Sequence, residues 1–117
     1  MKQDVGLTNV SNETNYGEAL FEKIKHVNEY GQEFWYAREL QEVLEYKEWR
    51  NFSKVLDRAM TACENSQNKI PDHFVEVNKM VNIGSGAGRE LIDFELSRYA
   101  CYLIVQNGDS RKLKHIL

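Results

Sequence analysis

The most regular apolar pattern in the chain lies between residues 52 and 63. Five residues at intervals of three and four positions form one side of a helix: Phe52, Val55, Leu56, Ala59 and Cys63. Such a stripe is typical of a helix that packs one side on a core. Upstream, Glu33 to Tyr36 predicts a short aromatic strand, and Ala37 to Leu44 predicts a helix. Residues 46–48 break the pattern, so the strand leads into a helix-turn-helix-like pair.

The segment before this unit predicts a tail and one helix. Residues 1–15 are mostly polar and have no periodicity, which predicts a flexible N-terminal tail. Apolar residues from Leu20 to Val27 follow helical spacing and predict a helix from about Asn15 to Glu29. Gly31 is placed to end it in a left-handed conformation.

The segment after the unit predicts a hairpin and a final helix. Pro71 leads into a strand from Phe74 to Ile83, and a second strand runs from Leu91 to Leu96. The glycine-rich loop 84–88 joins the two strands, which predicts an antiparallel hairpin. Ser97 then caps a helix that continues through Gln106. The pattern as a whole predicts an α+β fold, with helices packed on a small antiparallel sheet in a single domain over residues 16–117.

Composition changes this picture in one respect. The chain has 117 residues, of which 42% are hydrophobic and 28% charged, as expected for one globular domain. Its net charge of −3 argues against strong non-specific DNA binding, because such binding depends on neutralising phosphates. A nucleic-acid surface would therefore have to be a local basic patch.

The cysteines and the apolar runs indicate a protein of the cytoplasm. Cys63 and Cys101 each fall in an apolar helical pattern, which predicts buried thiols in a reducing compartment. The first residues have no apolar run of the signal-peptide type. No apolar run approaches the length of a membrane span, so we expect no membrane association.

Motifs for catalysis, metal binding or cofactor binding are not evident. His26, His73 and His115 fall in different elements, so no metal or catalytic pairing is expected. The GSGAGRE loop lacks the Lys-Ser/Thr pair of a phosphate-binding loop and precedes a strand. We therefore predict no enzyme, no cofactor and no metal site. Arg89, at the base of this loop, could still contact a phosphate or a partner.

The pattern that points to nucleic acid is a basic row. Arg50, Lys54 and Arg58 recur every four residues along the second helix of the pair, beside its apolar stripe. Lys47 and Trp49 lie near the start of that helix, where the helix dipole favours an anion. Trp49 could stack on a base or anchor the helix in the core.

Acidic residues weigh against this interpretation. Asp57 interrupts the basic side of the helix. Four nearby glutamates form an acidic band: Glu39, Glu42, Glu45 and Glu48. A solvated surface with no ligand therefore stays open as an explanation of the row.

Three long strings carry a resemblance to a known family. These are FWYARELQEVLEYKEWRNFSKVLDRA, DHFVEVNKMVNIGSGAGRE and DFELSRYACYLIVQNGDSRK. They resemble the N-terminal part of the DNA-damage-inducible protein D family, over about Tyr16 to Lys112. More distantly, the aromatic strand and the ARELQEVL helix resemble the BRO-type N-terminal domain of viral and phage proteins.

The resemblance implies a non-enzymatic role in the bacterial SOS response, by DNA binding or by modulation of the RecA filament. It supplies no catalytic residue. Two departures are visible: Glu45 stands where the pattern usually has glycine, and the chain ends at Leu117, where family members continue. We therefore expect a truncated C-terminal edge, whose exposed Ile116 and Leu117 would favour a homodimer.

Two functional hypotheses follow. In the first, the domain contacts DNA, single- or double-stranded, or a nucleoprotein filament through Lys47, Trp49, Arg50, Lys54, Arg58 and Arg89. In the second, it is a protein-interaction module of the antirepressor type that makes no contact with nucleic acid.

Overall fold

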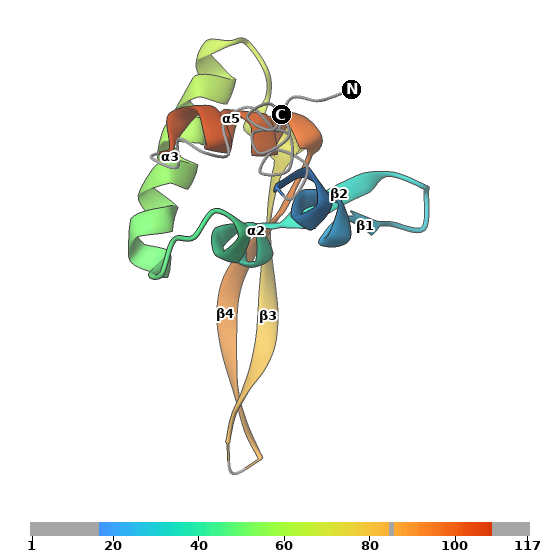
Figure 1. Ribbon diagram of the computed structural model, residues 1–117, viewed down its shortest axis with the longest axis vertical. Coiled ribbons are helices and arrows are strands. Elements are labelled where there is room, and N and C mark those ends of the chain that lie inside the picture. The colour runs from blue at the N-terminus through green and yellow to red at the C-terminus, as the bar shows by residue number, and fades with distance from the viewer. Residues whose placement is uncertain (1–16, 85, 109–117) are drawn as a thin grey trace, which may run out of the picture.

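The computed structural model describes residues 17–84 and 86–108, and Figure 1 shows their arrangement. Residues 17–23 are helical. The elements that follow are β1 (His26–Val27), β2 (Glu33–Tyr36), α2 (Ala37–Val43), α3 (Trp49–Asn65), α4 (Ile70–His73), β3 (Phe74–Gly84), β4 (Ala87–Leu96) and α5 (Arg98–Asn107). Helices pack on an antiparallel sheet, so the predicted α+β fold is confirmed.

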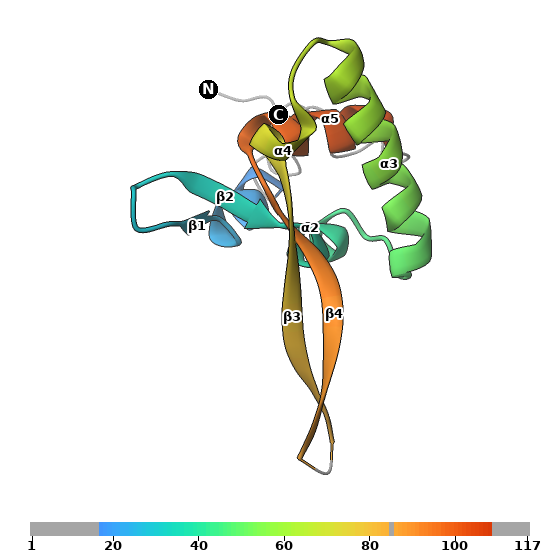
Figure 2. The same cartoon turned by 180° about the vertical axis from the view of Figure 1, so that it is seen from behind.

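The four strands lie in the order β1-β2-β4-β3, and neighbouring strands are antiparallel. β2 pairs with β4 at two positions, Trp35 with Leu96 and Tyr36 with Glu95. β3 and β4 pair along their whole length, which confirms the predicted hairpin. Its outer part, residues 78–92, projects away from the helices as a twisted ribbon, which we call the arm (Figures 1 and 2).

The core lies where α2, α3 and α5 meet the base of the sheet. All five apolar residues of the predicted α3 stripe are buried. Trp35 of β2 is fully buried, stacks on Phe21 with 4.4 Å between ring centroids, and donates from Nε1 to the Phe21 carbonyl oxygen at 2.9 Å. These contacts fix the helical segment 17–23 to the sheet, because a buried indole N–H needs an acceptor.

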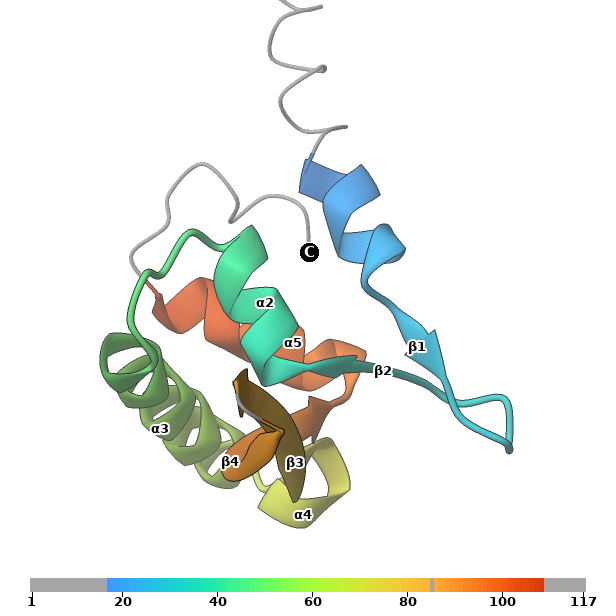
Figure 3. The same ribbon diagram turned by 90° about the horizontal axis from the view of Figure 1, so that it is seen from below.

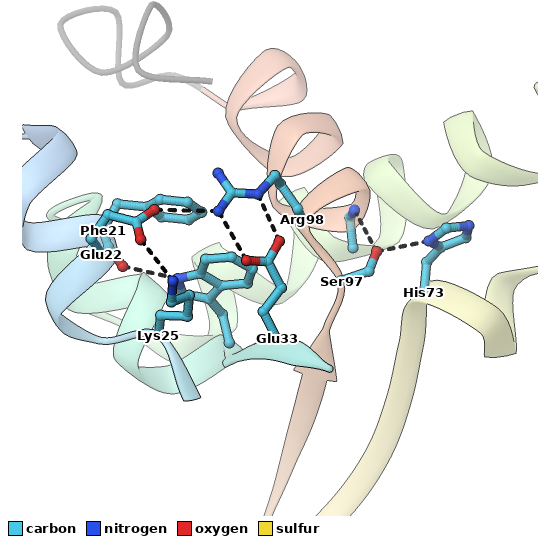
Figure 4. A network of polar contacts seen from close by, with 9 residues as sticks. Phe21, Glu22, Lys25, Glu33, His73, Ser97 and Arg98 are labelled. Carbon is cyan, nitrogen blue, oxygen red and sulfur yellow. Dashed lines mark hydrogen bonds and ion pairs between the residues drawn. The ribbon is translucent and has the colours of Figure 1, made fainter. Parts of the chain in front are cut away.

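The start of α5 is fixed by side chains from two elements. Ser97 accepts a hydrogen bond from the backbone N–H of Ala100 at 3.0 Å, so its predicted role as the cap of this helix is confirmed. The same hydroxyl lies 2.7 Å from Nδ1 of His73, which ties the end of α4 to α5 (Figure 4). His73 therefore has a structural partner.

Arg98, the first residue of α5, joins three elements through ion pairs (Figure 4). Its guanidinium donates to both carboxylate oxygens of Glu33 on β2, at 2.7 and 3.0 Å, and to Glu22 at 3.3 Å. These hydrogen bonds lower the pKa of the Glu33 carboxyl, and Lys25 followed by Arg98 lowers that of Glu22. The network therefore stabilises the fold while both carboxylates are ionised.

We expect the stability that Arg98 contributes to disappear in acid. Because Glu33 and Glu22 have lowered pKa values in the folded state, their contribution is present above the ordinary value of 4.5 and is lost as the pH falls further. The side chains are about half exposed, so the contribution is about 1 kcal/mol. Urea denaturation of the wild type and of Arg98→Gln at pH 7 and at acidic pH measures it. A difference that is equal at both pH values would contradict the ion-pair origin.

The two cysteines are free thiols and buried. Burial raises the pKa of Cys63 and of Cys101, which keeps both protonated and unreactive. The prediction of buried thiols is confirmed.

The prediction of a helix from about Asn15 to Glu29 is wrong at its C-terminal end. Helical residues stop at 23, and His26 and Val27 form strand β1, which pairs with Glu33 and Phe34. The turn between β1 and β2 is closed by the Asn28 side chain, which accepts from the backbone N–H groups of Tyr30 and Gln32. Val27 had been counted as part of the helix, but it is 60% exposed.

Two further boundaries differ from those expected. Ile70–His73 forms the short helix α4, with Pro71 at its start, where the sequence predicted a direct entry into the strand. Both strands of the hairpin extend into the glycine-rich segment, to Gly84 and from Ala87. The predicted tail up to residue 15 and the predicted dimer edge at Ile116 and Leu117 lie outside the described residues, as does His115.

Candidate nucleic-acid interface

α3 presents the predicted basic row to solvent. Its 17 residues bury one side in the core, and Arg50, Lys54 and Arg58 are all exposed. The loop between α2 and α3 and the C-terminal end of α5 both lie beside this helix (Figures 1 and 3). The row is therefore bordered by two other segments that can supply side chains.

A cleft of about 480 Å³ lies between α3 and the loop that precedes it. It is lined by Glu45, Tyr46, Lys47, Asn51, Lys54, Val55 and Arg58. We call it the basic cleft. Three of the predicted contact residues thus meet on one concave surface, Lys54 and Arg58 from α3 and Lys47 from the loop before it.

The loop that forms one wall of the cleft is held in a specific conformation. Tyr46 donates from its backbone N–H to the Gln41 carbonyl oxygen at 3.0 Å, and the Gln41 side chain donates to the Tyr46 carbonyl oxygen at 3.0 Å. Between them, Glu45 has a φ of +66°, a left-handed conformation that suits glycine. This closure ends α2 and sets the position from which Lys47 enters the cleft.

Glu45 was not among the predicted contact residues, yet it lines the basic cleft. One feature of the sequence had marked Glu45 as unusual: the family that the chain resembles usually has glycine at this position. Sequence alone showed that a glycine was missing, but it did not show that the residue in its place would line the same cleft as Lys47 and Lys54.

Arg58 has a structural contact as well as a place in the cleft. Its guanidinium donates to the carbonyl oxygen of Asn107, the last residue of α5, from Nε at 3.3 Å and from Nη2 at 3.1 Å. A cation at a helix C-terminus is favourable because it satisfies a terminal carbonyl and the helix dipole. Part of its charge is therefore directed toward the protein itself.

Arg50 lies outside the lining of the basic cleft. Its side chain is 81% exposed and lies 3.5 Å from the carboxylate of Glu48. An exposed ion pair of this kind contributes little to stability, so Arg50 is available to a ligand. It lies beside the cleft on the same helix rather than within it.

Trp49 packs inward at the start of α3. Its ring lies 5.9 Å from that of Phe52, and the guanidinium of Arg38 lies 4.0 Å from its centroid. Arg38, on α2, also donates from Nε to the Ile92 carbonyl oxygen at 2.8 Å. Arg38 is a residue that sequence reasoning missed, because its partners lie far away in the chain.

Arg89 is not part of this cluster. It lies on β4 in the arm, opposite Val81, and its side chain is exposed. The structure thus divides the predicted residues between the basic cleft, the exposed start of α3 and the arm.

Part of the acidic band beside the row is paired. Glu48 lies against Arg50, and Glu39 lies 2.7 Å from Nε2 of His26 on β1. Within residues 17–84 and 86–108, no cluster of three or more His, Cys, Asp or Glu side chains could hold a metal ion. In the same residues, no helix has the length and apolar character needed to cross a membrane.

The chain is similar in sequence to known proteins over most of its length. The BRO family, N-terminal domain, matches residues 23–116. The chain is 58% identical over 92 residues to the DNA damage-inducible protein D of Escherichia coli (strain K12), an alignment that covers 79% of this chain and 34% of that protein. The chain thus spans about a third of that relative. No solved structure shows a significant match.

Proposed function

Because the chain belongs to the BRO family, whose N-terminal domain matches most of its length, we propose that it is a non-enzymatic DNA-binding domain of the DNA-damage response. The name of its relative in E. coli supports the connection to DNA damage. We further propose that it acts in the bacterial cytoplasm, as part of the SOS response.

The observation that carries the DNA-binding proposal is the convergence of Lys47, Lys54 and Arg58 on the basic cleft. Phosphate groups are bound by clustered cations, and such contacts position a protein on DNA without reading the bases. α3 begins beside the cleft, so its dipole adds to the attraction for an anion. The net charge of −3 implies that binding is confined to this surface and depends strongly on salt.

Fluorescence anisotropy with labelled DNA at increasing salt tests the proposal. With about three cations in contact, the logarithm of the affinity should fall with the logarithm of the salt concentration with a slope of about −3. Lys54→Gln should weaken binding to all sequences alike and make the slope shallower by about one. Absence of binding to single- and double-stranded DNA at low salt would exclude the proposed function.

Lys69→Gln is the matched control for this substitution. Lys69 is also exposed, but it lies between α3 and α4, away from the basic cleft. The substitution removes the same charge from the chain, so equal effects of Lys54→Gln and Lys69→Gln would show that net charge, and not the cleft, determines affinity.

The net charge of −3 favours a second candidate, in which the domain contacts a protein. The partner would be the RecA filament or, as for an antirepressor, a repressor. This candidate is preferred if the chain sediments with RecA filaments while it binds no free DNA.

A further inference from the structure

The arm leaves both of its edges without a neighbouring strand. β3 is the outermost strand of the sheet, and β4 pairs with β2 at Glu95 and Leu96 but not, in the described residues, between Ala87 and Ile92. Such a ribbon exposes backbone donors and acceptors as well as side chains on both faces. An edge of this length normally requires protection or a partner.

The tip of the arm displays an apolar side chain on an irregularity of the ladder. Asn82 pairs with Gly88 and Gly84 pairs with Ala87, so Ile83 is an extra residue with no partner across the hairpin. Ile83 is 61% exposed. A bulge redirects a side chain and is frequent at binding sites, and here it directs an isoleucine into solvent.

A second apolar side chain covers the ribbon just below the tip. Met80 is 69% exposed. Its methyl carbon lies only 2.8 Å from the place that a Cβ on residue 88 would occupy. Gly88 therefore leaves space for Met80 to lie across the ribbon. At the tip, Gly84 and Gly86 adopt φ values of +101° and +73°, and a Cβ built on either would meet no atom within 4 Å.

Arg89 is the basic side chain that the arm exposes near its tip. Lys79 pairs with the buried carboxylate of Asp93 at 3.2 Å, whereas Arg89, next to Glu90 in the chain, is exposed. The arm also leaves the body at the level of the N-terminal end of α3 and continues past it (Figures 1 and 2). A polyanion bound at the start of α3 would thus have the arm beside it.

We propose that the arm inserts into a groove of double-stranded DNA, with Ile83 and Met80 as its apolar contacts. A two-stranded ribbon fits a DNA groove, and inserted apolar side chains are a recurrent means of gripping or bending a duplex. The glycine tip permits close approach to the backbone of the DNA, and Arg89 is placed to contact a phosphate. This inference rests on the proposed function and assigns it a duplex as ligand.

A second copy of the chain is the other occupant that two free edges could attract. The two-stranded, projecting shape of the arm (Figures 1 and 2) and its exposed Arg89 favour the duplex. Pairing of the arm with a second copy would instead appear as self-association of the chain in sedimentation.

The test compares the variant Met80→Ser/Ile83→Ser with Val27→Ser in binding to a labelled duplex and to a single strand of the same length. Val27 is a fitting control, because it is 60% exposed and lies on β1, in a different hairpin. We expect the arm variant to bind the duplex about tenfold more weakly and the single strand unchanged. Val27→Ser should bind both as the wild type does.

Each outcome is decisive. If the wild type binds duplex DNA and the arm variant binds it equally well, the arm inference is overturned and the proposed function stands. If the wild type binds no DNA, both fail. If the arm variant loses self-association in sedimentation while its duplex affinity is unchanged, the arm is a dimer interface and the inference is again overturned.

Discussion

Replacing Asp93 with alanine is expected to lower the free energy of unfolding by about 3 kcal/mol. Asp93 lies on β4 and is fully buried. Its Oδ1 accepts hydrogen bonds from the backbone N–H groups of Arg38, at 3.0 Å, and Phe94, at 2.8 Å. Each amide that loses its acceptor in a buried position costs about 1–3 kcal/mol, so the two together account for the expected loss.

The first of these bonds makes Asp93 the cap of a helix distant in the chain. α2 has no side-chain cap from its own N-cap residue, Tyr36, and Arg38 lies in its first turn. A carboxylate at a helix N-terminus is also favoured by the helix dipole. Asp93 therefore fixes α2, and with it the wall of the basic cleft, to the base of the arm.

Lys79 provides a way to separate capping from charge pairing. Its ammonium lies 3.2 Å from Oδ2 of Asp93 and 3.3 Å from the centroid of the Tyr36 ring. Its side chain is 33% exposed, so it can turn to solvent when Asp93 is removed. Lys79→Met, by contrast, leaves the buried carboxylate of Asp93 without its cation, so we expect it to cost about 3 kcal/mol.

Urea denaturation of three variants measures these contributions. Asp93→Asn keeps an acceptor for the two amides and loses the charge, so it should cost about 1 kcal/mol. If Asp93→Asn is as destabilising as Asp93→Ala, the charge and not the capping bonds is responsible. Equal stability of Asp93→Ala and the wild type would contradict the assigned role altogether.

Asp93 also shows where sequence reasoning ended. β2, α3 and α5 could be predicted because each buries one side, so their apolar spacing records the contact with the core. Asp93 lies on the buried side of β4. From the alternation along the strand, a buried position is expected to hold an apolar residue, and a charged residue is expected to face solvent. The partner of Asp93 is an N–H group 55 residues away, and no local pattern encodes that pairing.

The hairpin of the arm was predicted, but its full length and its projection from the body were not, for the opposite reason. Neither of its faces is buried beyond the base, so hydrophobic and polar residues along Asn78 to Ile83 follow no period that the core could impose. The same absence of a core partner explains β1, whose two residues are held by pairing with β2 rather than by burial. The wall of the basic cleft that α3 forms could be predicted from the basic row. The other wall could not, because its position depends on how α2 ends.

The second prediction concerns that ending: Glu45→Gly is expected both to stabilise the fold and to tighten DNA binding. Glu45 adopts a φ of +66°. A left-handed conformation costs an L-residue about 1–2 kcal/mol, and glycine avoids this cost but loses more entropy on folding. The net gain in the free energy of unfolding should be about 0.5–1 kcal/mol.

The gain in affinity has a separate cause. Glu45 lines the same cleft as Lys47, Lys54 and Arg58, where its carboxylate would compete with the proposed phosphate for the cations. Its removal should raise DNA affinity by up to about tenfold at about 0.1 M salt, the equivalent of one phosphate contact. A strained residue that opposes the proposed ligand is the kind of outlier that points to tuning of function.

Two control variants separate the two effects. Glu45→Gln removes the charge and keeps the backbone strain, so it should increase DNA affinity without increasing stability. Gln67→Gly relieves a similar strain, at a φ of +64° just after α3, and should increase stability without changing affinity. Anisotropy and urea denaturation of the three variants measure both quantities. If Glu45→Gln leaves DNA affinity unchanged while Lys54→Gln lowers it, the carboxylate does not compete with the bound phosphate, and the conformation of the loop alone explains its position.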